Sequence, residues 1–307
     1  MAAHPEANAK LTIKAVRNLA RILAEVDPST FGLLQCRGVV KIEGAQDANT
    51  LFPPTPNFKF VFSIPLGLSK PRSLREILLS SARFSLDERL ELAKKPVNSV
   101  LFVHTARFVH KNIRPETVIV FQNENSPIGA PFLVGFQQFR VEDGGTYRMG
   151  DGVWEHNLYR HPSRQGIHPE VDYEMQHDIY SLGVLLLEIG LWTSFVLYSK
   201  SDASCQPQRN DIIGSLNLSG RPHTCKIAYK NKQVLEEFAE RELAPQLGKR
   251  YTNIVLQCLR CSDTGLSGNF NQPCSPVGGI GWADEDGVTV GARYIENVIE
   301  GMQAISL

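Results

Sequence analysis

The sequence lacks an excess of charge of either sign. It has 32 Lys and Arg residues and 32 Asp and Glu residues, so its formal net charge is zero. It also lacks a basic block and an RNA-binding signature. The charge balance therefore gives no reason to expect a nucleic-acid partner or an anionic membrane partner.

Long apolar runs are missing as well. The longest mostly apolar stretch, Leu182 to Trp192, contains Glu188 and is far shorter than the roughly 20 residues that cross a bilayer. The first residues, Met1 to Glu6, are not a basic start followed by an apolar segment, so no signal peptide is predicted. We expect no membrane span.

The sequence has six cysteines, and their spacing does not suit a metal site. Only Cys258 and Cys261 form a C-x2-C pair, no second pair stands at zinc-like spacing, and His223 near Cys225 is the one weak extra candidate. The remaining cysteines are Cys36, Cys205 and Cys274. This pattern favours buried free thiols in a reducing compartment. We predict no metal and a cytoplasmic location.

The first third of the chain predicts one helix followed by a pair of strands. Apolar residues at helical spacing indicate a helix over about 9–26, which Asp27-Pro28 ends because proline disfavours helix in the residue before it. Strand-like segments follow at 33–42 and 58–64, separated by a proline-rich loop. We expect an antiparallel pair with a long connection.

Further elements follow from capping and periodicity. Ser85 and Glu88 form a capping box that opens a helix to about His104, which Pro96 should kink. The other expected elements are a short helix at 73–79, a hairpin from 117–121 and 132–134, an irregular segment at 140–176, a polar surface insertion at about 199–220, amphipathic helices at 234–243 and 250–259, a loop at about 262–292 and a closing helix at 294–305.

A helix from Asp178 to about Trp192 organises the rest. It is apolar on nearly every face, and a helix without a polar face belongs in the middle of a domain. Asp178 is expected to be its N-cap. Glu188 inside it should pair with another group or reach solvent at the helix end.

Four segments, in order, resemble landmarks of protein kinases. His110-Lys111-Asn112-Ile113-Arg114-Pro115-Glu116-Thr117 resembles the catalytic loop H-R-D-L-x-x-x-N, and Gly135-Phe136-Gln137 stands where kinases have D-F-G. Tyr159-Arg160-His161-Pro162-Ser163 stands in place of Y-R-A-P-E, and the helix at Asp178 resembles the central helix of the large lobe. The pattern is also similar to degenerate kinase-like domains of filamentous fungi that accompany HeLo-type domains.

The resemblance implies an α+β, protein kinase-like fold. Residues 1–66 would form a reduced small lobe of one helix with two or three antiparallel strands. Residues 67–307 would form a mainly helical large lobe. By the same resemblance, His110 and Phe136 pack into the core, and Asp178 bonds the backbone of the catalytic loop. Lys111 and Arg160 would either form a solvated basic face or bind a phosphorylated Thr146 or Tyr147.

The chemistry that the family needs is degenerate here. Phosphoryl transfer uses a catalytic-loop aspartate as base and a loop asparagine and the D-F-G aspartate as magnesium ligands. Those positions hold Asn112, Thr117 and Gly135, and the loop lysine is Arg114. Losing a general base alone typically costs about 10²–10⁴ in rate. Arg114, Val118 and Ile119 are the residues left that could contact a nucleotide.

The upstream nucleotide machinery is also missing from the sequence. There is no G-x-G-x-x-G, and only about ten residues precede the first helix. Lys41 superficially matches the nucleotide lysine, but it follows the helix that this lysine should precede. That helix offers Asn18 and Arg21 where a glutamate partner is expected, and Glu25 lies too close to its end.

Three hypotheses follow. The first is a catalytically inactive kinase-like domain, without a cofactor, that binds a protein partner in fungal signalling. The second is an atypical active kinase that uses ATP and magnesium, with Arg114 and a displaced acid such as Glu116 or Asp151. The third is a piece of a longer kinase-domain protein.

Overall fold

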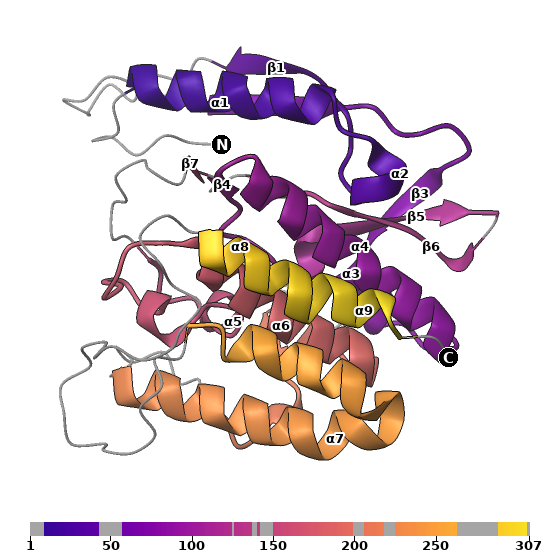
Figure 1. Ribbon diagram of the computed structural model, residues 1–307, viewed down its shortest axis with the longest axis vertical. Helices are drawn as coiled ribbons and strands as arrows, with labels where there is room; N and C mark the ends of the chain where they lie inside the picture. Colours follow the sequence, from indigo (N-terminus) through magenta and orange to yellow (C-terminus); the bar gives the residue numbers. More distant parts are fainter. Residues whose placement is uncertain are drawn as a thin grey trace.

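The computed structural model describes residues 9–42, 57–124, 126–136, 140–141, 150–198, 206–217, 225–262 and 288–305. These parts form a mixed α+β structure in which small antiparallel sheets accompany packed helices (Figure 1). This agrees with the predicted α+β class. No helix within the described ranges is long and apolar enough to cross a bilayer.

The first layer contains α1 (Ala9–Ala24), α2 (Pro28–Phe31), β1 (Cys36–Ile42) and β2 (Asn57–Phe62). α1 buries Val16, Leu19 and Leu23 at helical spacing and packs on β1. The predicted antiparallel pair is confirmed, with Val39 opposite Phe60. Among the described residues, two strands precede residue 66, and the proposed lobe boundary falls in the connector between β2 and β3.

The second sheet has the order β3–β5–β6, formed by β3 (Ser69–Ser73), β5 (Val118–Asn123) and β6 (Ser126–Leu133). The predicted hairpin is confirmed, although its strands run closer to the turn than expected. A shorter ladder joins β4 (Phe108–Val109) to β7 (Arg140–Val141). β3 was not predicted. The second ladder was not predicted either, because residues 140–176 were expected to be irregular.

Two helices precede the candidate loop. α3 (Leu74–Leu78) is capped by Ser73, whose hydroxyl accepts from the Glu76 backbone N–H. α4 (Leu86–Thr105) begins with the predicted capping box of Ser85 and Glu88. α4 is one continuous helix through Pro96.

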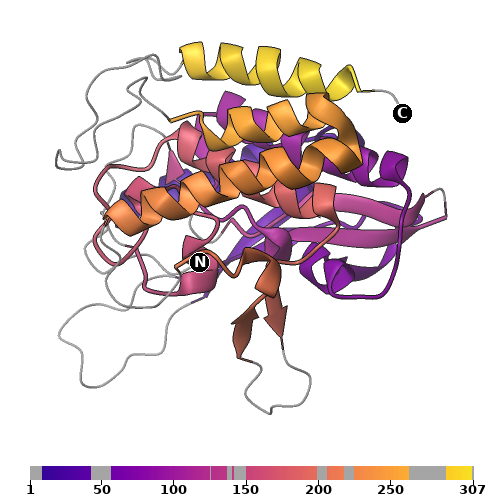
Figure 2. The same ribbon diagram turned by 90° about the horizontal axis from the view of Figure 1, so that it is seen from below.

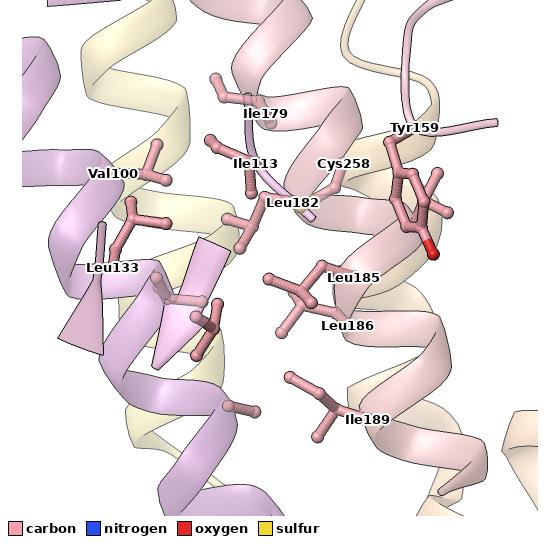
Figure 3. Close-up of a cluster of buried hydrophobic side chains, with 14 of the residues drawn as sticks. Val100, Ile113, Leu133, Tyr159, Ile179, Leu182, Leu185, Leu186, Ile189 and Cys258 are labelled. Atoms are coloured by element: carbon pink, nitrogen blue, oxygen red, sulfur yellow. The ribbon is translucent and has the colours of Figure 1, made fainter. Parts of the chain in front are cut away.

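The centre of the molecule is α6 (Met175–Leu191), all of whose residues are buried. It packs between α4 and α7 (Figures 1 and 2). Figure 3 shows Ile179, Leu182 and Ile189 of α6 facing the side of the core that contains Val100 and Leu133. The prediction that Asp178 caps this helix is wrong: the helix begins three residues earlier, its N-cap is Glu174, and Asp178 lies in the first turn.

α7 (Cys225–Leu259) approaches α6 closely at two glycines. A Cβ on Gly183 would lie 2.8 Å from Cβ of Cys258, and one on Gly190 would lie 2.6 Å from a Leu243 methyl carbon. α7 is interrupted at Gly248, where φ is 77°. Both predicted amphipathic helices lie within it, on either side of this glycine.

The segment between α6 and α7 contains β8 (Val196–Tyr198), β9 (Pro207–Arg209) and η3 (Asp211–Ile213). β8 and β9 form a hairpin that projects from the helices (Figure 2). Ile213 and Leu216 are nonetheless buried. Part of the predicted surface insertion is therefore core, and residues 199–205 and 218–224 lie outside the described ranges.

The chain closes with α8 (Val288–Tyr294), a π-helical turn η4 (Ile295–Glu300) and α9 (Gly301–Gln303). This run lies against α4 and α7. The predicted closing helix is confirmed but begins earlier, inside the predicted loop at 262–292. Most of that loop lies outside the described ranges.

Candidate functional site

The candidate loop runs from β4 through His110–Arg114 and the 3-10 turn η1 (Pro115–Thr117) into β5. Thr117, at the expected magnesium-ligand position, closes this turn. Its Oγ1 lies 2.7 Å from the Asn112 carbonyl oxygen and 2.9 Å from that of Arg114, and it accepts from the Arg114 N–H at 3.2 Å. Thr117 thus holds the loop backbone and is itself buried.

Asp178 holds the start of the loop. Its carboxylate accepts from the backbone N–H groups of His110 (2.6 Å) and Lys111 (2.8 Å), the contact that the kinase resemblance implied. It also accepts from the Tyr173 hydroxyl at 2.7 Å and lies 3.2 Å from Nε2 of His104. Burial alone would raise the pKa of this carboxyl, but the hydrogen bonds with His104 and the His110 backbone bring it below its ordinary value.

His110 is a packed, neutral residue. Its Nδ1 accepts from the Asn112 N–H, so the proton lies on Nε2, which donates to the Val134 carbonyl at 3.1 Å. Its ring lies 4.7 Å from that of Phe136, centroid to centroid. Burial lowers the pKa of His110 to about 4. Such a histidine does not shuttle protons at neutral pH.

Asn112 and Gly135 meet across the place where a kinase would hold its catalytic carboxylates. Nδ2 of Asn112 donates to the Gly135 carbonyl at 3.4 Å. Gly135 has φ of 92°, a backbone conformation that favours glycine. The two positions therefore offer an amide donor and no side chain, and neither supplies an anionic oxygen.

Arg114 and Glu116 lie side by side without a close ion pair. Nε of Arg114 is 3.8 Å from Oε2 of Glu116, and neither atom has a hydrogen-bond partner among the described residues. Among the other two residues predicted to contact a nucleotide, Val118 is fully buried in the core. Ile119 is half-buried beside a small apolar cluster formed by Leu34, Phe121 and Phe132.

A buried polar network lies under the loop and was not predicted. Arg75 of α3 donates to Glu116 at 3.0 Å and to Glu188 of α6 at 2.6 Å. The Tyr159 hydroxyl donates to Glu188 at 2.7 Å and also contacts Arg75. Burial acts to raise the pKa of Glu116, but the charge of Arg75 brings it below its ordinary value. Glu188, as expected, has a partner.

Asp151 and Arg160 form a second ion pair. Arg160 donates to Asp151 at 2.8 Å, and Nδ1 of His156 lies 3.3 Å from the same oxygen. Burial acts to raise the pKa of Asp151, but the hydrogen bonds with His156 and Arg160 bring it well below its ordinary value. Asp151 and Glu116, the two candidates for a displaced base, are therefore both weak bases held by arginine.

Binding of a phosphorylated segment, one of the two roles predicted for Lys111 and Arg160, depends partly on residues outside the described ranges. Arg160 is engaged by Asp151, and Lys111 lies over the Tyr173 ring, with Nζ 5.4 Å from its centroid. Thr146 and Tyr147 lie outside the described ranges. Lys41 lies exposed on β1, and on α1 Asn18 is half-buried while Arg21 and Glu25 are exposed.

The cysteines that the structure describes are packing residues. Cys36, Cys258 and Cys261 are free and buried, and burial raises the pKa of Cys258 well above its ordinary value. Cys261 donates to the Gln176 carbonyl at 3.2 Å. Among the described residues, no group of three or more His, Cys, Asp or Glu side chains is placed to hold a metal ion. Cys205, His223 and Cys274, and the side chain of Cys225, lie outside the description.

The structure therefore brings the loop positions Asn112, Arg114 and Thr117 together with Gly135, and seats them on His110, Phe136 and Asp178. Arg160 belongs to a separate cluster with Asp151. Sequence reasoning missed Arg75, Tyr159 and Tyr173. The aromatic at 159 lay inside a recognised motif, but no local signal marked Arg75.

Comparison with known proteins gives distant similarities to kinases. No protein-family model matches the chain. It is 25% identical over 162 residues to a probable serine/threonine-protein kinase of Dictyostelium discoideum, covering 52% of this chain and 9% of that protein. It is 21% identical over 191 residues to death-associated protein kinase 2 of mouse and of human, covering 61% of this chain and 47% of each. The chain thus spans less than half the length of these relatives, and the similarities indicate a kinase-like fold.

Proposed function

We propose that this chain is a kinase-like domain that does not transfer phosphate and acts as a binding or regulatory module for a protein partner. The observation that carries the proposal is the pair Asn112 and Gly135. Where a kinase places its base and its main magnesium ligand, this chain has an amide that donates to a glycine carbonyl. Neither group can take a proton from a hydroxyl or bind a divalent cation as an anion.

The surrounding carboxylates do not replace the missing ones. Glu116 is bound by Arg75, and Asp151 is bound by Arg160. Both carboxyl groups have pKa values below their ordinary values, so both are poor proton acceptors. These contacts count against an atypical active kinase built on Glu116 or Asp151. The resemblance to fungal kinase-like domains extends the proposal to a role in fungal signalling.

The contacts around the loop support a structural role for it. Asp178, His110 and Phe136 hold the loop in place through buried contacts, although the loop carries no catalytic acid. A loop with a fixed backbone and no catalytic group suits the binding of a partner, because binding needs a defined surface but no catalysis.

A titration with ATP, with and without magnesium, tests the proposal directly. We expect no magnesium-dependent thermal shift at millimolar ATP and no transfer of labelled phosphate to the chain or to a generic protein substrate. Transfer that is lost in Asn112→Ala or Arg114→Ala would overturn the proposal. Loss in Glu116→Gln or Asp151→Asn instead would favour the atypical kinase.

A restored variant separates the loss of these two carboxylates from the loss of the upstream nucleotide-binding residues. Asn112→Asp combined with Gly135→Asp returns the two carboxylates, and aspartate is among the residues that tolerate a positive φ best. Magnesium-dependent nucleotide binding in this variant, and not in the natural sequence, would show that Asn112 and Gly135 account for the missing binding.

A further inference from the structure

The zero net charge of the chain conceals an exposed basic and apolar segment. Residues 57–73 include β2, the connector and β3, and they contain Lys59, Lys70 and Arg72 but no Asp or Glu. All three basic side chains are exposed. In Figure 1 the connector between β2 and β3 runs along the periphery of the molecule.

Three aliphatic side chains are exposed on the same segment. Val61 is 47% exposed, Ile64 is 54% exposed and Leu66 is 103% exposed, which means that Leu66 is as accessible as in an extended peptide. Leu66 lies at the tip of a turn in which the Leu68 N–H donates to the Pro65 carbonyl at 3.3 Å. Three exposed aliphatic side chains within six residues differ from the single scattered ones that are normal on a protein surface, and they suggest a contact surface.

The neighbouring elements of this layer are also basic. α1 packs on β1 and exposes Lys14, Arg17 and Arg21 at spacings of three and four residues, which places them along one stripe. The strands add the exposed residues Arg37 and Lys41. The described residues of α1, β1 and the chain between them expose two carboxylates, Glu25 and Asp27.

We propose that residues 57–73, from β2 through the connector to β3, form a docking surface for an anionic membrane. The aliphatic tip, with Ile64 and Leu66, would enter the interfacial region of the lipid, and Lys59, Lys70 and Arg72 would lie near the negatively charged headgroups. Each base near such a surface contributes a factor of about five to partitioning. The proposal concerns a surface distinct from the candidate loop and holds whether or not that loop transfers phosphate.

The chemistry favours lipid over the other anionic partners. Single-stranded nucleic acid is bound by aromatic side chains on which bases stack, and the exposed apolar residues here are aliphatic. A peptide that binds in a groove would find one elsewhere, in the pocket lined by Trp154, Arg209 and Leu216. A second copy of the chain would bring the same basic surface against itself in a two-fold contact, which like charges oppose.

Vesicle co-sedimentation with the full chain tests the proposal. We expect binding to vesicles that contain roughly one-third phosphatidylserine, little binding to pure phosphatidylcholine, and weakening as salt is raised. Lys70→Glu with Arg72→Glu should reduce partitioning at least tenfold, and Ile64→Ser with Leu66→Ser should reduce it several-fold. All four residues are exposed, so an unchanged thermal midpoint is expected.

Matched controls use exposed residues that lie outside residues 57–73. Lys226→Glu with Lys230→Glu removes two exposed bases of α7, and Ile167→Ser removes an aliphatic side chain that is 61% exposed. These variants should retain binding. The proposal is overturned if charged vesicles are not bound or if neutral vesicles are bound equally. It is also overturned if the Lys70/Arg72 variant or the Ile64/Leu66 variant binds as the wild type does. It is equally overturned if the controls lose as much binding as the connector variants, or if an acidic protein or RNA is bound while vesicles are not.

Discussion

The carboxylate of Asp178 accepts a hydrogen bond from the backbone N–H of His110 at 2.6 Å, across 68 residues of sequence. The same carboxylate accepts from the Lys111 N–H and the Tyr173 hydroxyl. A single fully buried side chain therefore joins the central helix to the candidate loop and to the segment before the helix.

Replacing this carboxylate by an amide should destabilise the protein. In Asp178→Asn, one of the two oxygens becomes an NH₂ group that faces a backbone donor, which leaves buried donors unpaired. We expect a loss of about 2–4 kcal/mol in the free energy of unfolding, measured by urea denaturation. The exposed Glu296→Gln should change it by less than about 0.5 kcal/mol. Similar values for the two variants would contradict the role given to Asp178.

Acidification should destabilise the fold through His110. Its pKa is about 4 in the folded chain against an ordinary value of 6.5, so the unfolded chain binds the proton first as pH falls. Stability is therefore lost below about pH 6.5, and the loss from His110 alone is about 2 kcal/mol between pH 7 and pH 5. Burial also lowers the pKa of His161, which adds to the same trend.

The pH dependence can be assigned by substitution. His110→Gln should flatten the plot of unfolding free energy against pH, even if it lowers stability at every pH. His168 is exposed, and His168→Gln should leave the slope unchanged. An unaltered slope in His110→Gln would show that other groups govern the acid response.

The buried ion pair between Arg75 and Glu188 should be strongly coupled. Arg75→Met leaves the Glu188 carboxylate buried without its cation, and burial already raises the pKa of this group. We expect a loss of about 3–5 kcal/mol for Arg75→Met and a partial recovery in the double variant with Glu188→Gln. The exposed pair of Arg260 and Glu240 is the control, with an expected loss of about 1 kcal/mol or less for Arg260→Met. Additive effects of the two buried substitutions would refute the coupling.

The two glycines of α6 should not tolerate alanine. A Cβ at Gly183 or Gly190 would meet carbon atoms of α7 at 2.8 and 2.6 Å, so the backbone of α7 or its side chains would have to shift. Overpacking of this kind costs about 1–3 kcal/mol, which outweighs the gain of roughly 1 kcal/mol in helix propensity. Gly291 in α8 has open space around it, so Gly291→Ala should stabilise the protein. Thermal unfolding of the three variants gives the comparison.

Local sequence patterns predicted the elements whose causes are local. The capping box of Ser85 and Glu88 needs only four residues, and it starts α4 as expected. The strand pairs β1–β2 and β5–β6 follow from short segments rich in β-branched and aromatic residues that loop-forming residues separate. The kinase-like landmarks predicted that Asn112, Thr117 and Gly135 lie around one loop.

Contacts between distant residues escaped prediction. The local sequence predicts that Asp178 is an N-cap. Its backbone partners, however, lie 67 and 68 residues away, and Asp178 reaches them from inside the helix. Arg75 reads as an ordinary surface residue of a short helix, and only the fold brings it to Glu188, 113 residues later. The basic and apolar connector was invisible in the total charge, because exposure decides which charges act together.

The closing helix has a consequence for synthesis of the chain. The Tyr294 hydroxyl donates to the Val97 carbonyl, 197 residues earlier, and the Tyr294 ring is almost completely buried. The residues of α4 that α8 and η4 cover leave the ribosome long before α8 and η4 are synthesised. During translation, this apolar surface has to be shielded by a chaperone or by transient contacts until α8 and η4 arrive.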